Sequence, residues 1–129
     1  MSKIYQIHNL HLSISILIVV FAAVIYGFYP QFFNIQLTSV NEFSLLKAVM
    51  GLYLSFATLW LIGIFSENYW KTATICNALF MLGLGFGRII SFIFDGLPSV
   101  FFVIGTFGEF FLGFYALVQL KKHQKKKAI

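Results

Sequence analysis

The chain has 129 residues, of which 60% are hydrophobic and only 10% are charged, and its mean hydropathy is +0.88. Because soluble domains of ordinary composition are about 25% charged, these values exclude a soluble domain and indicate an integral membrane protein. At about 30 residues per span with its connection, the length predicts an all-α fold: one domain over residues 1–129, built as a transmembrane four-helix bundle with antiparallel up-down-up-down topology.

The first two predicted spans are joined by the longest connection of the chain. Residues 10–29 form an apolar stretch that Pro30 ends, and residues 45–65 form the second helix, with Ser44 as its expected N-cap. Between them, residues 31–43 mix polar side chains with Phe32 and Phe33, which predicts a segment along the membrane surface.

The third and fourth spans, residues 71–94 and 100–120, are separated by a tight turn. In that turn Gly96 permits a positive φ, Pro98 stops the preceding helix, and Ser99 is the expected N-cap of the next helix. Gly83 and Gly87 have the four-residue spacing that lets a second helix approach closely.

The formal net charge of +5 comes from the two ends of the chain, because Lys3 and five lysines of the basic tail, residues 121–129, supply +6 and the rest of the chain carries −1. Short flanks rich in lysine face the cytoplasm, so we expect a multi-pass protein of the cell inner membrane with both termini cytoplasmic. The tail is expected to contact anionic lipid headgroups, and no nucleic-acid partner is expected.

The stretch Gly-Arg-Ile-Ile-Ser-Phe-Ile-Phe-Asp-Gly-Leu-Pro-Ser at residues 87–99 resembles the signature of a bacterial family of small four-span membrane proteins, the domain of unknown function number 4345. Lys-Ala-Val-Met-Gly-Leu-Tyr at residues 47–53 resembles its other recurring stretch, and Glu109 matches an acidic position. The resemblance implies the fold and a membrane location. It brings no activity with it.

Charged side chains inside the spans are the candidate site, because charge within a bilayer is costly and usually functional or paired. At 1.5 Å per residue, Lys47, Arg88 and Glu109 lie about 7, 10 and 15 Å inside the outer ends of their helices. We therefore predict that Arg88 contacts Glu109 and that Lys47 joins them. The predicted ligand-binding or buried polar cluster is Lys47, Arg88, Glu109, Asn77, Thr106 and Asp95.

Each of these residues also has a purely structural interpretation. Arg88 and Glu109 would then be an ion pair that fixes helix register, Lys47 would extend to the membrane surface, and Asp95 would serve the turn. His8 and His11 have a spacing that suits two metal ligands, but without a third ligand nearby no metal site is predicted. No cofactor is expected either.

Three functions compete at this point. The first is a binding or transport module that holds a small anionic ligand or a lipid headgroup in the cluster. The second is a structural or accessory subunit, in a homo-oligomer or in a larger membrane complex. The third is an intramembrane enzyme with Glu109 as its acid or base. The sequence contains no HExxH, CxxC, Walker loop or nucleophile elbow, which favours a role other than catalysis.

Overall fold

The computed structural model describes residues 8–128. It contains four long helices, α2 (Leu10–Phe28), α3 (Val40–Phe65), α4 (Glu67–Asp95) and α5 (Val100–Ala128), and a short 3-10 helix, η1 (Pro30–Phe33). The described residues form no strand, and all four long helices are apolar and long enough to cross a membrane. The predicted all-α fold with four membrane spans is confirmed. The alternating direction of the spans across a bilayer stays a prediction.

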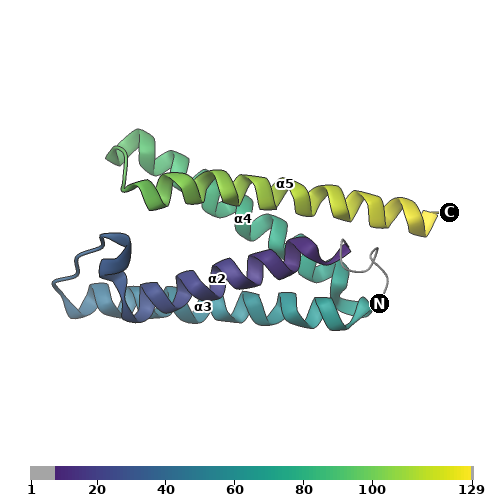
Figure 1. Cartoon of the computed structure of the whole chain (residues 1–129), viewed down its shortest axis with the longest axis horizontal. Coiled ribbons are helices and arrows are strands. Elements are labelled where there is room, and N and C mark those ends of the chain that lie inside the picture. The colour runs from purple at the N-terminus through teal and green to yellow at the C-terminus, as the bar shows by residue number, and fades with distance from the viewer. Residues whose placement is uncertain (1–7, 129) are drawn as a thin grey trace.

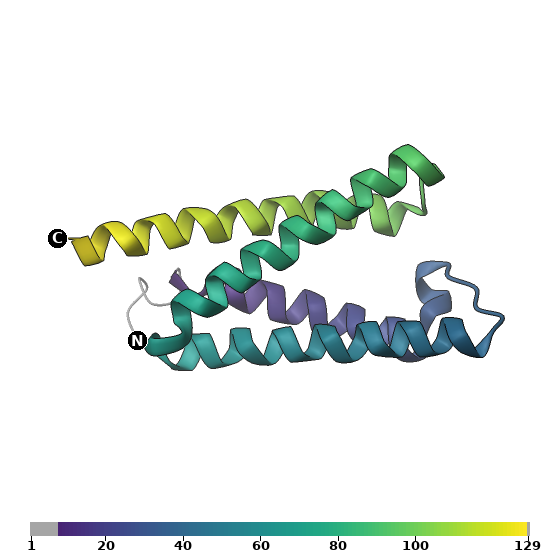
Figure 2. The same cartoon turned by 180° about the vertical axis from the view of Figure 1, so that it is seen from behind.

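The four helices form two pairs that diverge toward one end. α2 packs along α3, and α4 packs along α5 (Figures 1 and 2). α4 leaves α3 at the short turn around Ser66 and runs obliquely away from it, so α3 and α4 are far apart where α4 ends. We call the end that carries η1 and the turn at residues 96–99 the turn end, and the opposite end the terminal end. The divergence opens the bundle at the turn end.

An apolar layer crosses the middle of the bundle. Its central side chains are Val19 of α2, Met81 of α4 and Leu112 of α5, all buried. Buried Trp60 of α3 belongs to the same hydrophobic core. Along the helices, polar side chains lie on both sides of this layer, so it divides the interior into two polar regions.

The prediction that Ser44 is the N-cap of α3 is wrong. The helix begins at Val40 and its N-cap is Ser39, whose hydroxyl accepts a hydrogen bond from the backbone N–H of Glu42 at 3.2 Å. The Glu42 carboxylate in turn accepts a bond from the backbone N–H of Thr38 at 3.0 Å. This reciprocal arrangement satisfies two N–H groups that Ser44 cannot reach, which explains the earlier start.

α4 and the end of α5 also extend beyond the predicted ranges. α4 begins at Glu67, directly after Ser66, and α5 continues through the lysine-rich segment to Ala128, because lysine, glutamine and alanine are good helix formers. Gly96 has a φ of +91°, as the turn requires. Ser99 receives hydrogen bonds from the backbone N–H groups of Phe102 and Val103 on its backbone carbonyl. Its hydroxyl makes no hydrogen bond within residues 8–128, so its predicted side-chain cap is wrong.

Candidate functional site

Arg88 and Glu109 form an ion pair between α4 and α5. The Nε atom of Arg88 donates to both carboxylate oxygens of Glu109, at 2.9 Å each. Both side chains are largely buried, with 21% of Arg88 and 12% of Glu109 exposed. The predicted contact between the two residues is therefore confirmed. It joins the two helices near the turn end, within segments that are apolar enough to span a membrane.

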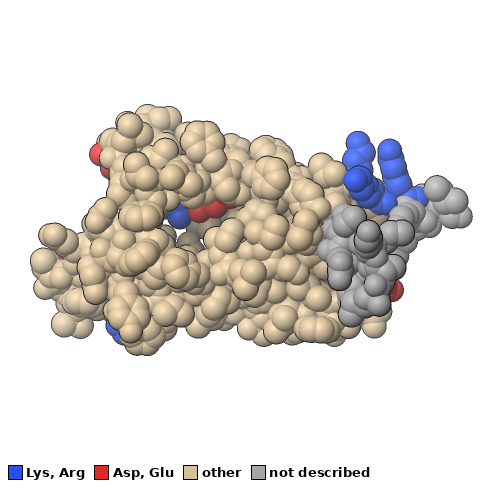
Figure 3. Space-filling model, viewed as in Figure 1, with Lys and Arg blue, Asp and Glu red and all other residues tan. Residues whose placement is uncertain are grey.

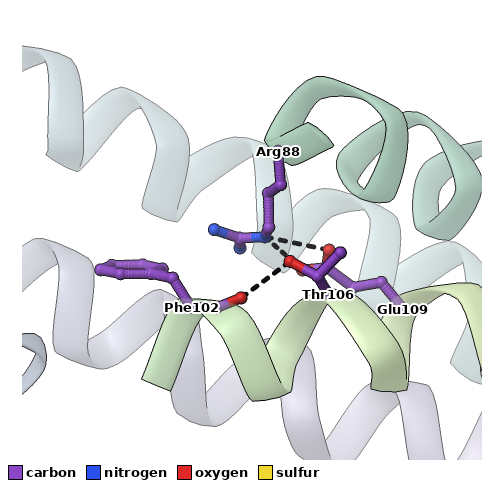
Figure 4. A network of polar contacts seen from close by, with 4 residues as sticks. All are labelled: Arg88, Phe102, Thr106 and Glu109. Carbon is purple, nitrogen blue, oxygen red and sulfur yellow. Dashed lines mark hydrogen bonds and ion pairs between the residues drawn. The ribbon is translucent and has the colours of Figure 1, made fainter. Parts of the chain in front are cut away.

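The ion pair uses only one of the donor groups of the guanidinium. In Figure 4 the two terminal nitrogens of Arg88 point away from Glu109 and lie beside the ring of Phe102. The guanidinium carbon is 5.1 Å from the centre of that ring, close enough for a cation–π contact. Tyr26 also interacts with the guanidinium through its hydroxyl. An arginine has five N–H donors in a planar fork, and one hydroxyl cannot satisfy all the groups that point away from Glu109, so a further acceptor can bind.

A cavity of about 300 Å³ lies beside the ion pair, between α2 and α5. We call it the α2–α5 cavity. Arg88 and Glu109 supply its charges, and the rest of its wall is formed by small or apolar side chains of α2, η1, α4 and α5. Figure 3 shows the hollow, with basic and acidic atoms visible inside it and uncharged residues around it. Ile18, Phe21 and Ile104 at its edge are more than half exposed, so the cavity opens sideways toward lipid.

A second cavity of about 480 Å³ lies on the other side of Arg88, between the diverging α3 and α4. We call it the α3–α4 cavity. Leu46, Val49 and Tyr53 of α3 form one wall, and residues of α4 from Gly83 to Phe92 form the other. Three residues line both cavities, namely Tyr26, Arg88 and Phe102. Together these three side chains form the partition between the two spaces.

Glycines leave room in both cavities. A Cβ atom added at Gly105 or Gly108, in the α2–α5 cavity, would meet no atom within 4 Å, and the same holds for Gly83 and Gly87 in the α3–α4 cavity. The spacing of Gly83 and Gly87 predicts a close helix approach, but no other helix of the described chain lies against them. Here they widen a cavity instead.

Lys47 is not brought to the ion pair. Its Nζ atom donates to the carbonyl oxygen of Gly27 at 3.0 Å, and it lies 5.5 Å from the ring centre of Phe28 and 5.7 Å from that of Phe43. The carbonyls in the last turn of α2 lack intrahelical partners, and a cation at a helix C-terminus is favourable. Lys47 thus supports the end of α2 and lines neither cavity.

The other predicted site residues lie at different distances from the ion pair. Thr106 is buried on the next turn of α5 from Glu109, but its hydroxyl donates to the backbone carbonyl of Phe102 at 2.8 Å (Figure 4). Asp95 is exposed and accepts a hydrogen bond from the hydroxyl of Ser91 at 3.0 Å. Asn77 is fully buried on the terminal side of the apolar layer, and its side-chain amide makes no hydrogen bond with the described residues.

Asn77 belongs to a second polar region whose contacts the sequence did not predict. His11 and Thr74 share a hydrogen bond of 3.0 Å between Nε2 and Oγ1, and Trp70 donates to the side-chain oxygen of Asn9 at 2.9 Å. Ser15 is buried as well. The sequence does show small polar residues at helical spacing on α2 and α4. Such spacing alone does not show which side chains meet.

Rings close the terminal end of this second region. His8 stacks on Trp70 with 4.0 Å between ring centres, and His123 of α5 lies 4.5 Å from Trp70 on a tilted plane. Within residues 8–128 no group of three histidine, cysteine or acidic side chains has an arrangement that could hold a metal ion. The second region is therefore best described as a packed contact among α2, α4 and α5.

Comparison with known proteins concerns almost the whole chain. A family model, the domain of unknown function DUF4345, matches residues 7–120. The chain belongs to this family. The matched residues include α2, α3, α4, α5 as far as Leu120, and both members of the Arg88–Glu109 pair. No curated protein and no solved structure matches the chain. The fold and the family together establish a multi-pass membrane protein, and its function must be argued from the site.

Proposed function

We propose that this protein is a membrane-embedded binding module for an amphipathic molecule whose head group carries a phosphate. The observation that supports it is the α2–α5 cavity, in which an otherwise apolar wall surrounds the Arg88–Glu109 pair. Small-molecule sites typically combine an apolar wall with a few convergent polar groups. An arginine fork suits a phosphate, and the terminal nitrogens of Arg88 point away from Glu109 (Figure 4).

Charge counting narrows the head group. Because Lys47 contacts the end of α2, the charges at the cavity are those of Arg88 and Glu109, which sum to zero. An anion bound by Arg88 would therefore also experience repulsion from Glu109. A zwitterionic head group matches both charges, with its phosphate on Arg88 and its ammonium group near Glu109. Phosphatidylethanolamine has this chemistry.

The depth of Arg88 agrees with a ligand that comes from the bilayer. α4 has 29 residues and its middle residue is Met81, so Arg88 lies about 10 Å from the middle of the helix toward the turn end. The hydrocarbon region of a bilayer extends about 15 Å from its centre. Arg88 therefore lies inside the hydrocarbon region, about 5 Å from its boundary. The cavity edge at Phe21 and Ile104 is open to lipid, so a head group drawn slightly below the boundary could meet the guanidinium.

The orientation forms part of the same proposal. The exposed lysines Lys121, Lys122 and Lys125 lie at the terminal end, which Figure 3 shows as a group of basic side chains. By the positive-inside rule this end faces the cytoplasm of a cell inner membrane, where the lysines contact anionic lipid. The phosphate site then belongs to the outer leaflet.

The experiment compares lipid retention in matched variants. Wild type, Gly105→Leu and Gly51→Leu are purified identically, and bound lipid is measured by native mass spectrometry. A leucine at position 105 enters the α2–α5 cavity, whereas Gly51 has equally open surroundings but lines neither cavity. We expect Gly105→Leu to lose the lipid and Gly51→Leu to keep it. Equal retention in all three proteins would contradict the proposal and favour an accessory subunit whose ion pair serves only packing.

A further inference from the structure

The two cavities lie on opposite sides of one guanidinium. Arg88 lines both of them, and Tyr26 and Phe102 form the rest of the partition. The ring centres of Tyr26 and Phe102 are 6.5 Å apart with nearly parallel planes. A head group on the terminal nitrogens of Arg88 would thus stand at the boundary of two separate apolar spaces.

Both spaces are elongated along the helices. On α5 the lining of the α2–α5 cavity runs from Phe101 to Leu112, a length of about 16 Å. On α4 the lining of the α3–α4 cavity runs from Gly83 to Phe92, a length of about 14 Å. Helices that cross a bilayer lie roughly along its normal, which is also the direction of acyl chains. Arg88 lies five residues from the inner end of the α3–α4 lining, and Glu109 lies three residues from the inner end of the α2–α5 lining. Each cavity therefore has the direction and the apolar wall for the first part of one acyl chain, which continues into lipid through the open side.

Both spaces are also reachable from lipid without passing through the bundle. Phe21 and Ile104 at the edge of the α2–α5 cavity are exposed, and so are Gly83, Gly87 and Pro98 at the edge of the α3–α4 cavity. The two chains of one molecule could enter the two cavities, on opposite faces of α4, only if a residue near their shared head group, such as Arg88, lines both cavities. Their common lining by this residue satisfies that condition.

We propose that the ligand is a two-chain phospholipid that straddles Arg88, with its phosphate on the terminal nitrogens and one acyl chain in each cavity. This inference rests on the proposed function and names its substrate class. A one-chain amphiphile, such as a fatty acid or a lysophospholipid, would fill one cavity and leave the other without a role.

The test blocks the cavities one at a time. Gly105→Leu and Gly108→Leu narrow the α2–α5 cavity, and Gly83→Leu and Gly87→Leu narrow the α3–α4 cavity. Two positions for each cavity guard against a variant that does not fold, and Gly51→Leu is the control. An added Cβ meets no atom within 4 Å at any of these five positions. Each full-length protein, stripped of lipid in detergent, is titrated with dioleoyl phosphatidylethanolamine and, separately, with its one-chain lyso form.

We expect a leucine in either cavity to weaken binding of the two-chain lipid by about tenfold, since overpacking of a filled site typically has this effect. Gly51→Leu should bind as wild type does. Binding of the lyso form should be sensitive to leucines in at most one cavity. Inorganic phosphate at equal concentration should not displace the two-chain lipid, because it shares only the contact with Arg88.

The possible failures are distinguishable. If leucines at Gly105 and Gly108 abolish binding while leucines at Gly83 and Gly87 do not, the ligand occupies one cavity, and the two-chain inference is overturned while the proposed function stands. Loss only with leucines at Gly83 and Gly87 overturns the two-chain inference and also the proposed function, which places the ligand in the α2–α5 cavity. If phosphatidylethanolamine does not bind to wild type, or if no cavity variant changes its binding, both proposals fall together.

Discussion

The Nε atom of Arg88 lies 2.9 Å from both carboxylate oxygens of Glu109, so one N–H group of the arginine meets both oxygens and its two terminal nitrogens are directed elsewhere. A pair that served only to join α4 and α5 would gain more from the two-pronged geometry in which parallel N–H groups meet the two oxygens. The observed geometry joins the helices and directs the other donors of Arg88 toward Tyr26 and the two cavities.

The pair should still stabilise the fold. Removing one partner of a buried ion pair costs about 3–5 kcal/mol, because the other charge is left without compensation. We expect Arg88→Leu and Glu109→Leu each to lower the stability measured by denaturant titration in detergent. The double variant should recover most of the loss, and damage equal to the sum of the two single variants would show that the side chains act independently.

Lys47 should affect stability but not ligand binding. Its bond to the Gly27 carbonyl and its charge at the end of α2 predict a loss of about 0.5–1 kcal/mol in Lys47→Met, while Lys47→Arg keeps both. Thermal denaturation checks the first part. Retention of phosphatidylethanolamine checks the second and should equal that of wild type in both variants. A lower retention in Lys47→Met alone would place this cation in the site.

The three charged residues inside the spans, Lys47, Arg88 and Glu109, show how far the sequence predicts this site. Depth and helical face predict the contact of Arg88 with Glu109, since the two residues lie about 5 Å apart in depth on neighbouring helices and the arginine side chain is long enough to cover that difference. They do not predict where the long side chain of Lys47 goes, because that depends on an unsatisfied carbonyl of another helix. The sequence does not predict the cavities either, because the divergence of α3 from α4 follows from packing between whole helices.

The terminal end offers a test of packing that is independent of any ligand. At Gly63 an added Cβ would overlap the Cβ of Ala73, because α3 and α4 are closest near the Ser66 turn. We expect Gly63→Val to lower stability by about 1–3 kcal/mol, as overpacking does. Gly51→Val, on the same helix but in open surroundings, should change it by less than about 0.5 kcal/mol. Equal melting temperatures for the two variants would contradict the close contact.

The direction of the spans can be measured with reporter fusions. Positions after Lys71 and after Pro98 lie at opposite ends of α4. Alkaline phosphatase is active only outside the cytoplasm, and green fluorescent protein exported in unfolded form does not fluoresce there. We expect phosphatase activity from the fusion after Pro98 and fluorescence from the fusion after Lys71. The same reporter response at both positions would disprove the alternating topology and, with it, the placement of the Arg88 site in the outer leaflet.

The apolar layer of Val19, Met81 and Leu112 separates the Arg88–Glu109 pair from the region around His11 and Asn77. A proton or another ion that reached one side would have to leave all polar contact in order to arrive at the other, at a high energetic cost. A single chain should therefore not conduct ions across the membrane, in spite of the charged residues within its spans. A lipid bound near Arg88 would exchange with the lipids of one leaflet only. Its transfer to the other leaflet would require the two helix pairs to separate.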